Sequence, residues 1–164
     1  YTPSLGCWGF QYRPQDGHDF SIPSKVDVVV THGPPKGVMD YAKSGQRAGC
    51  PGLFGAVARA RPRMHCFGHI HEGWGAKLVT WRGKASESPS HLTDIDSGRS
   101  VKIRRLSDMA AEDLQGCCST SHCTGDRHPL RRGIQTLFVN AAVEGVDGSR
   151  QSPWVVDLEL PRAL

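Results

Sequence analysis

Aromatic side chains are scarce in this sequence, at 7% of 164 residues, and hydrophobic residues make up only 38%. No run of about 18 apolar residues is present, so the sequence contains no candidate for a membrane-spanning helix. The chain does not begin with methionine, and Tyr1-Thr2-Pro3 does not resemble a signal peptide. A chain of this length can bury one core. The low apolar content therefore indicates that part of the chain is not packed, or that it comes from inside a longer protein.

Strong charge of either sign is also missing. The formal net charge is +4 and the isoelectric point is near 8.8. The basic residues do not form a stripe interleaved with aromatic residues, so nucleic-acid binding is not indicated. The six cysteines are too sparse for the disulfide framework of a small secreted domain, and we interpret them as reduced. We expect a cytoplasmic or otherwise intracellular protein.

The most regular part of the sequence is an apolar run, an amphipathic segment and a second apolar run. Residues 26–31 are β-branched, as is typical of a strand covered on both faces. Residues 52–61 place their apolar side chains on one helical face, with proline at the start and just after the end. Residues 64–67 predict a second buried strand. This order is a βαβ unit, so we expect the two strands to be parallel.

Three histidines follow the ends of these two strands. His32 comes directly after the first strand, and His69 and His71 follow the second. Parallel strands bring their carboxyl ends to one edge of a sheet, where ligands bind in open α/β folds. Imidazole is the commonest metal-binding side chain. The sequence therefore predicts a metal site made by these histidines, and the alternative is a structural turn at each position.

The second half of the chain is less regular. Residues 76–81, 136–140 and 154–160 predict further strands. Between them, residues 84–135 contain no Phe, Trp or Tyr, eight serines and closely mixed charges. Such a segment buries too little apolar area to offset its ordering entropy. We predict a mostly disordered insertion with a short helix near Ser107, whose removal changes stability little.

Two motifs resemble the calcineurin-like metallophosphoesterases: Thr31-His32-Gly33-Pro34-Pro35 and Gly68-His69-Ile70-His71. Shorter matches resemble the subgroup of metallophosphoesterase-domain brain proteins and their fungal and bacterial relatives, namely Tyr1-Thr2-Pro3, Trp8-Gly9-Phe10, Gly49-Cys50, His71-Glu72-Gly73 and Asn140-Ala141. The resemblance implies that residues 1–83 and 136–164 are the C-terminal part of a metallophosphoesterase domain, interrupted at 84–135. The implied fold class is α/β, part of a β-sandwich flanked by helices.

The function implied by this resemblance is hydrolysis of phosphate mono- or diesters at a site with two divalent metal ions. His32 and His69 would bind one ion and His71 the other, with Mn, Fe, Zn and Ni as the candidate ions. Two cations activate a water and neutralise the charge that develops at phosphorus. The implied partner is a small phosphoester, with cyclic nucleotides suggested by the subgroup. No membrane or nucleic-acid partner is expected.

The earlier motifs of the family, Asp-x-His, Gly-Asp and Gly-Asn-His, are missing from the places where the resemblance requires them. Asp16-Gly17-His18 and Gly125-Asp126 have matching letters, but no apolar strand leads into either, as these motifs require. Only a circular permutation would bring them into use. We therefore expect the C-terminal half of a phosphoesterase domain and assign no catalytic residue. The alternative is a truncated, inactive phosphoesterase-like scaffold or binding protein.

Several residues near the histidines have two interpretations. Trp74 contacts a substrate base or packs over a loop, and Asn140 lines the pocket or caps a turn. Asp40 has a role in the site or a purely structural one. Glu72 orients a histidine, as carboxylates beyond the metal ligands do, or faces solvent. For His65 we expect a hydrogen-bonded position in the core.

A second candidate metal site is the segment Cys117-Cys118-Ser119-Thr120-Ser121-His122-Cys123. Three thiols and an imidazole could bind zinc. Zinc sites usually pair two short clusters across a longer loop, and only one cluster is present. Incidental cysteines are therefore the preferred interpretation.

Overall fold

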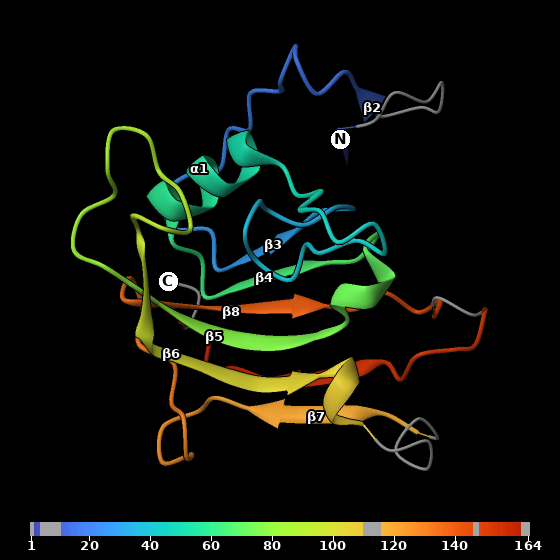
Figure 1. Cartoon of the computed structure of the whole chain (residues 1–164). Coiled ribbons are helices and arrows are strands. Elements are labelled where there is room, and N and C mark those ends of the chain that lie inside the picture. Colours follow the sequence, from blue (N-terminus) through green and yellow to red (C-terminus); the bar gives the residue numbers. More distant parts are fainter. Residues whose placement is uncertain (1, 4–10, 110–115, 146–147, 162–164) are drawn as a thin grey trace.

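The computed structural model describes residues 2–3, 11–109, 116–145 and 148–161. Its centre is a five-stranded sheet in the order β3-β4-β8-β5-β6 (Figure 1). These strands are β3 (Val28–Val30), β4 (Met64–Phe67), β5 (Gly75–Trp81), β6 (Ile95–Arg105) and β8 (Gln135–Asn140). Strands β3, β4 and β8 are parallel, whereas β5 runs antiparallel to both β8 and β6. The sheet is therefore mixed.

The remaining elements are short. Two small parallel sheets pair β1 (Thr2–Pro3) with β2 (Gln11–Tyr12), and β7 (Cys118–Ser121) with β9 (Trp154–Asp157). Helix α1 spans Pro51–Ala60, and the 3-10 turns η1 and η2 span His71–Gly73 and Leu106–Asp108. In the described part of the chain, no helix has the length and apolarity needed to cross a membrane. The fold is mixed α/β with little helix, and the two-layer calcineurin-like sandwich stays a prediction.

The βαβ unit is confirmed. Strands β3 and β4 pair in parallel, with Val28 opposite Met64 and Val30 opposite Cys66. Helix α1 lies between them in sequence and begins where the Cys50 Sγ accepts the Leu53 N–H at 3.2 Å. It ends at Arg61, whose left-handed backbone lets its N–H reach the Val57 carbonyl oxygen. The local signals at both ends of this helix were therefore sufficient to place it within a residue.

The central strands of the sheet are covered on both faces, whereas Val28 and Val30 of the edge strand β3 are exposed, so the expected cover on both faces of that strand is wrong. Helix α1 packs its buried side chains against one face, and Figure 1 shows it on the side away from β7. This cluster includes Leu53, Phe54, Val57, Phe67, Val79, Trp81 and Phe138. On the other face, side chains of β9 and the residue after it cover the inward-facing residues of β5 and β8. That cluster includes Ala76, Leu78, Leu137, Val139, Trp154, Val156 and Leu158.

The expectation that residues 84–135 are mostly disordered is wrong. Strand β6 pairs with β5 in the central sheet, with Leu78 opposite Val101, and β7 pairs with β9. The short helix expected near Ser107 is confirmed as η2. Strand pairing is made by the main chain, so few apolar anchors are needed: Ile95 is buried, and Val101 and Ile103 pack on the sheet. The assignment of this segment as an insertion in the domain stays a prediction.

The serines of this segment also help to order it. The buried carboxylate of Asp94 accepts bonds from the Ser86 N–H at 2.7 Å, the Ser86 hydroxyl at 2.8 Å and the Ser90 N–H at 2.9 Å. The Thr93 hydroxyl adds another at 2.6 Å. A buried carboxylate needs such donors to remain charged. The loop that leads into β6 is therefore fixed by polar contacts rather than by aromatic packing.

The N-terminal connector lies over the α1 face of the domain, where Tyr12, Phe20 and Ile22 pack against the core. This connector spans residues 1–24, and its residues Trp8 and Phe10 lie outside the described residues. The five cysteines of the described part are free thiols, and Cys7 lies outside it.

Candidate functional site

The site is built on the carboxyl ends of β3 and β4. His32 follows β3 and His69 follows β4, and parallel pairing brings them to the same edge of the sheet. The His32 Nε2 and the His69 Nδ1 lie 3.0 Å apart, with ring centroids 4.7 Å apart. Both side chains are exposed. The structure thus brings together two imidazoles that are 37 positions apart in sequence.

A tight turn directs His69 toward His32. The Gly68 N–H donates to the His32 carbonyl oxygen at 2.9 Å, and the Ile70 N–H donates to the Gly68 carbonyl oxygen at 2.8 Å. His69 lies between these bonds with φ +66°, in the left-handed region that non-glycine residues rarely adopt. Such backbone strain persists only where surrounding contacts enforce it, and it concentrates at functional sites. The turn therefore fixes the main chain on both sides of His69.

His71 begins the next turn and is held from two sides. Its carbonyl oxygen accepts the Trp74 N–H at 3.2 Å and the Gln151 side-chain Nε2 at 3.1 Å. The pKa of His69 is lowered by partial burial, and then by the nearby positive charges that His32 and His71 would carry. A positive charge on His71 would therefore lower the pKa of His69. Gln151 is a positioning residue that the motifs could not reveal, because it lies 80 positions after His71.

The donor set matches a metal site only in part. The two nearest nitrogens of His32 and His69 are metal-ligating atoms that face solvent and each other. Across the described ranges, however, no three His, Cys, Asp or Glu side chains gather closely enough to hold an ion together. Two imidazoles are an incomplete coordination shell. The residues thus fit two ligands of one ion, and the ligand role of His32, His69 and His71 stays a prediction.

For Trp74 and Asn140, the contacts support a structural role. Trp74 is buried, stacks on Trp154 at 5.0 Å between ring centroids, and donates its Nε1–H to the Ser152 carbonyl oxygen at 3.0 Å. It is thus packed and faces no substrate. Asn140 is buried and caps the turn, donating to the Ile70 carbonyl oxygen at 2.9 Å and accepting the Ala142 N–H at 3.1 Å. Both residues support the loop that carries the histidines.

Glycine at position 73 serves the same loop. A Cβ there would collide with the carbonyl oxygen of Met39 and the side chain of Asn140. The space beside Gly73 is filled by the protein's own chain, so it does not admit a substrate to the backbone. The missing side chain lets the histidine loop pack against the segment that follows β3.

Asp40 is structural. It is buried, forms an ion pair with Arg47, and accepts N–H bonds from Gly37 at 2.8 Å and Gly49 at 3.3 Å. Glu72 is half-buried, and no described residue forms a hydrogen bond or ion pair with its carboxylate. It therefore orients none of the three histidines in this structure.

His65 is the core histidine that we expected. Its side chain is fully buried, and its Nε2 lies 2.9 Å from the Thr31 hydroxyl. That hydroxyl donates to the Gly33 carbonyl oxygen at 2.8 Å, so His65 Nε2 carries the proton that the hydroxyl accepts. Burial lowers the pKa of His65 to about 3.

The cysteine-rich segment does not form a zinc site in the part of the chain that is described. Both ring nitrogens of His122 are engaged, Nδ1 with the His128 carbonyl oxygen at 2.7 Å and Nε2 with the Thr120 hydroxyl at 3.0 Å. The two segments that match earlier family motifs only by their letters, Asp16-Gly17-His18 and Gly125-Asp126, make contacts within their own surroundings. Asp126 accepts bonds from the Ser121 hydroxyl and the Cys123 N–H, and the His18 ring stacks on Tyr12.

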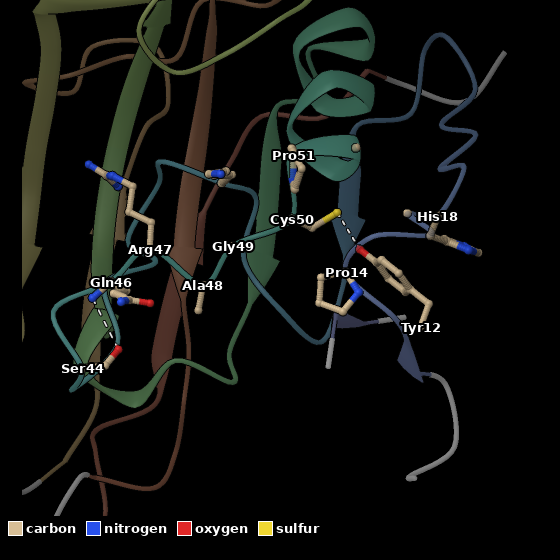
Figure 2. Close-up of a pocket in the computed structure, with 13 residues that line it drawn as sticks. Tyr12, Pro14, His18, Ser44, Gln46, Arg47, Ala48, Gly49, Cys50 and Pro51 are labelled. Carbon is tan, nitrogen blue, oxygen red and sulfur yellow. Dashed lines mark hydrogen bonds between the residues drawn. The ribbon is translucent and has the colours of Figure 1, made fainter. Parts of the chain in front are cut away.

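A cavity of about 500 Å³ lies apart from the histidine motifs, between the N-terminal connector and the start of α1 (Figure 2). The Tyr12 hydroxyl donates to the Cys50 Sγ at 2.7 Å. Burial, followed by this bond, raises the Tyr12 pKa. In Figure 2 the Tyr12 and His18 rings lie on one side of Cys50 and Arg47 on the other. Since Arg47 is paired with Asp40, this cavity has a tyrosine–thiol contact and one lysine, Lys36, that forms no ion pair among the described residues.

Over part of its length the chain resembles metallophosphoesterase proteins. It is 54% identical over 56 residues to metallophosphoesterase domain-containing protein 1 of Homo sapiens. The matched stretch covers 33% of this chain and 17% of that protein. It is 54% identical over 79 residues to a UPF0046 protein of Caenorhabditis elegans, 46% of this chain and 20% of that protein. It is 42% identical over 82 residues to probable rhamnogalacturonate lyase C of Emericella nidulans, 49% of this chain and 8% of that protein.

No family model matches the chain. The chain spans a fifth or less of the length of these three relatives. The names also differ in the chemistry they describe, and the one that names a lyase is matched over the smallest share of its length. The metallophosphoesterase resemblance is therefore real but partial, and it agrees with the His32 and His69 motifs read from the sequence.

Proposed function

We propose that the chain is part of a metal-dependent phosphoesterase and supplies three of its metal ligands. The observation that supports this most directly is the 3.0 Å approach of His32 Nε2 to His69 Nδ1 at the carboxyl ends of two parallel strands. The partial similarity to proteins named as metallophosphoesterases supports the same function. The proposed reaction is hydrolysis of a phosphate monoester or diester.

Each histidine has a distinct part in this proposal. His32 and His69, whose nearest nitrogens lie 3.0 Å apart, would hold one divalent ion, and His71 would hold a second. When bound, a pair of such ions activates a water and neutralises charge on the phosphoryl group. The turn at Gly68 sets the direction of His69, and Gln151 and Trp74 fix the main chain at His71. Among the described residues, no carboxylate lies with these histidines to bridge two ions. We propose that a longer protein supplies it.

An inactive scaffold or binding protein is the second candidate function. The observation that favours it is that no third ligand joins His32 and His69 among residues 11–109, 116–145 and 148–161. Without carboxylates, the charge of two divalent ions would not be balanced. A scaffold would retain the fold but have no need of the strained backbone at His69.

Metal binding distinguishes the phosphoesterase from the inactive scaffold. The purified chain, stripped with EDTA and titrated with Mn²⁺, Zn²⁺ or Ni²⁺, should bind metal more weakly in His32→Ala and in His69→Ala. Because each variant removes one of two ligands of the same ion, each should lose most of the bound metal in elemental analysis. His91→Ala, which changes a histidine in the loop before β6, is the matched control. Equal metal content in all four proteins would favour the scaffold.

Activity gives a second test. The 164-residue chain should not hydrolyse bis-p-nitrophenyl phosphate, because no group of three ligating side chains forms among the described residues to hold a pair of cations. In a longer protein that contains it, His32→Ala and His69→Ala should each abolish most turnover, and the double variant should be little worse. Metal-dependent turnover by the chain alone, lost in His71→Ala, would show that the ligand set is already complete.

A further inference from the structure

A basic cavity lies at the end of the sheet remote from the histidines. Thr80 of β5 pairs with Gln135 at the start of β8, whereas Gly75 pairs with Asn140 at its end. Asn140 contacts the histidine loop, and Gln135 borders the cavity. The five residue steps from Gln135 to Asn140 span about 17 Å of strand at roughly 3.3–3.4 Å each. Leu78 and Val101 place the cavity on the sheet face opposite α1. It is thus separate from the proposed metal site.

The cavity has a volume of about 350 Å³ and is lined mainly by polar groups. Arg99 comes from β6, and Arg127, His128 and Arg131 come from the loop between β7 and β8. Its lining contains no Asp or Glu, and no Phe, Tyr or Trp. All four basic residues belong to the segment 84–135, which the resemblance to phosphoesterases skips.

Within the described ranges, no acidic side chain forms an ion pair with these three arginines, all of which are exposed. In the described part of the chain, no residue forms a hydrogen bond or ion pair with the side chain of Arg99, Arg127 or Arg131. The adjacent Arg132 differs, because its Nη2 lies 4.0 Å from Asp27. The acidic residues nearest in sequence, Asp126 and Asp96, accept hydrogen bonds from Ser121 and Cys123 and from the Arg99 main-chain N–H, and neither forms an ion pair with these arginines. Like charges that face one cavity repel one another unless an anion joins them.

The walls of the cavity are fixed by hydrogen bonds. The Gln135 side chain donates to the Thr80 hydroxyl at 3.2 Å and accepts the Arg131 N–H at 3.1 Å. The Thr80 hydroxyl in turn donates to the Arg99 carbonyl oxygen at 2.9 Å. His122 holds the carbonyl oxygen of His128. The main chain is therefore tied to the sheet or to β7 at Arg99, His128 and Arg131, while the side chains of the three arginines are exposed.

We propose that this cavity binds a small soluble phosphate ester through Arg99, Arg127 and Arg131. Guanidinium groups bind phosphate oxygens in a two-pronged geometry, and three of them match a dianionic phosphate. The absence of aromatic lining argues against a stacked nucleobase, and the concave shape against an extended nucleic-acid strand. The partly buried amide of Gln135, which retains hydrogen-bonding capacity beyond its bonds to Thr80 and Arg131, suits a hydroxyl group of the ester.

Isothermal titration of the purified chain with inorganic phosphate and with glycerol 3-phosphate tests this, with EDTA present so that bound metal plays no part. We expect one site per chain, with tighter binding of glycerol 3-phosphate and weakening as salt rises. Arg99→Gln, Arg127→Gln and Arg131→Gln should each weaken binding about tenfold, because a hydrogen bond to a charged group is lost. The triple variant should show no binding.

The matched control is the triple variant Arg13→Gln, Arg59→Gln and Arg82→Gln, which removes the same charge from exposed positions elsewhere. It should bind glycerol 3-phosphate like the wild type, and melting curves should show that both triple variants are folded. No binding to the wild type at 10 mM ligand (about 2.7 kcal/mol of standard free energy), or equal loss in the two triple variants, would overturn the proposal. Binding only to vesicles that contain phosphatidic acid would overturn it too, since the ligand is proposed to be soluble.

Discussion

The side chain of Gln151 donates a hydrogen bond to the main-chain oxygen of His71, at 3.1 Å across 80 positions of sequence. The same oxygen accepts the Trp74 N–H. Gln151 is buried, and its own Oε1 has no partner among the described residues. A buried amide that is only half satisfied is costly. The hydrogen bond from Gln151 to the turn that begins at His71 therefore explains why this side chain is buried there.

Gln151→Leu should loosen this turn without unfolding the protein. The bond to His71 is lost, at about 1 kcal/mol, while the unsatisfied Oε1 is removed as well. We expect faster hydrogen exchange of the Trp74 N–H, and an unfolding free energy within about 1 kcal/mol of the wild type. Gln15→Leu, at an exposed position, is the control. Unchanged exchange at Trp74 would show that Gln151 does not position His71.

His65 should make the protein sensitive to mild acid. Its pKa is about 3 in the folded state because of burial, and about 6.5 when unfolded. The unfolded chain therefore takes up the proton first, and stability is lost as the pH falls from 6.5 toward 3. Between pH 7 and pH 5 this amounts to about 2 kcal/mol. Urea unfolding at both pH values measures it.

The matching variant is His65→Leu. It should reduce the loss of stability between pH 7 and pH 5, because no buried imidazole remains to be charged. The Thr31 hydroxyl keeps its bond to the Gly33 carbonyl oxygen in this variant. His128→Leu, outside the core, should retain the steep dependence of the wild type. If His65→Leu and the wild type responded equally to pH, another group would be responsible.

Asp94→Ala should destabilise the protein by about 2–4 kcal/mol, since several donors lose a charged acceptor at once. Partial burial raises the pKa of Asp94, but bonds from Thr93, Ser86 and Ser90 outweigh it and lower the pKa to about 2. Its stabilisation is present above the unfolded value near 4 and is lost as the pH falls toward 2. Glu87→Ala, in the same loop, should have little effect in the same denaturation experiment. Similar stability of the two variants would show that the Asp94 network contributes little.

Replacing residues 86–133 by a short Gly/Ser linker should lower the melting temperature by about 10–20 °C. The replacement removes β6, β7 and the Asp94 network. A loss of about 5 kcal/mol shifts the melting temperature of a domain of this size by about 2–4 °C per kcal/mol. Circular dichroism during heating measures the shift. A change of only a few degrees would restore the view that the segment is dispensable.

The sequence was informative where side-chain pattern and local signals agree. The βαβ unit follows from a β-branched run, a helix bounded by two prolines and a second apolar run. The approach of His32 to His69 follows from topology alone, because parallel strands end at one edge. Strand β6 was not recognised because its order comes from main-chain pairing with β5. Absence of aromatic residues carries no information about such pairing.

Other features depend on contacts between distant positions. Trp74 could have faced a substrate, and only its stacking on Trp154 and its bond to Ser152 show that it is packed. The serines near Asp94 suggested disorder by composition, yet they act as donors to one carboxylate. The three arginines of the basic cavity are spread over 33 positions, from Arg99 to Arg131 inclusive, and no periodicity links them.

Strand β3 is the edge of the sheet, paired with β4 on one side, and Val30 is 74% exposed. An open edge of this kind is a template onto which another strand can add. A strand that joined β3 in parallel would end beside His32, at the same rim as His69. Residues following that strand would reach the two imidazoles without any change in the fold described. The docking of a neighbouring strand and the completion of the coordination sphere would then be one event, so metal affinity would report directly on strand addition.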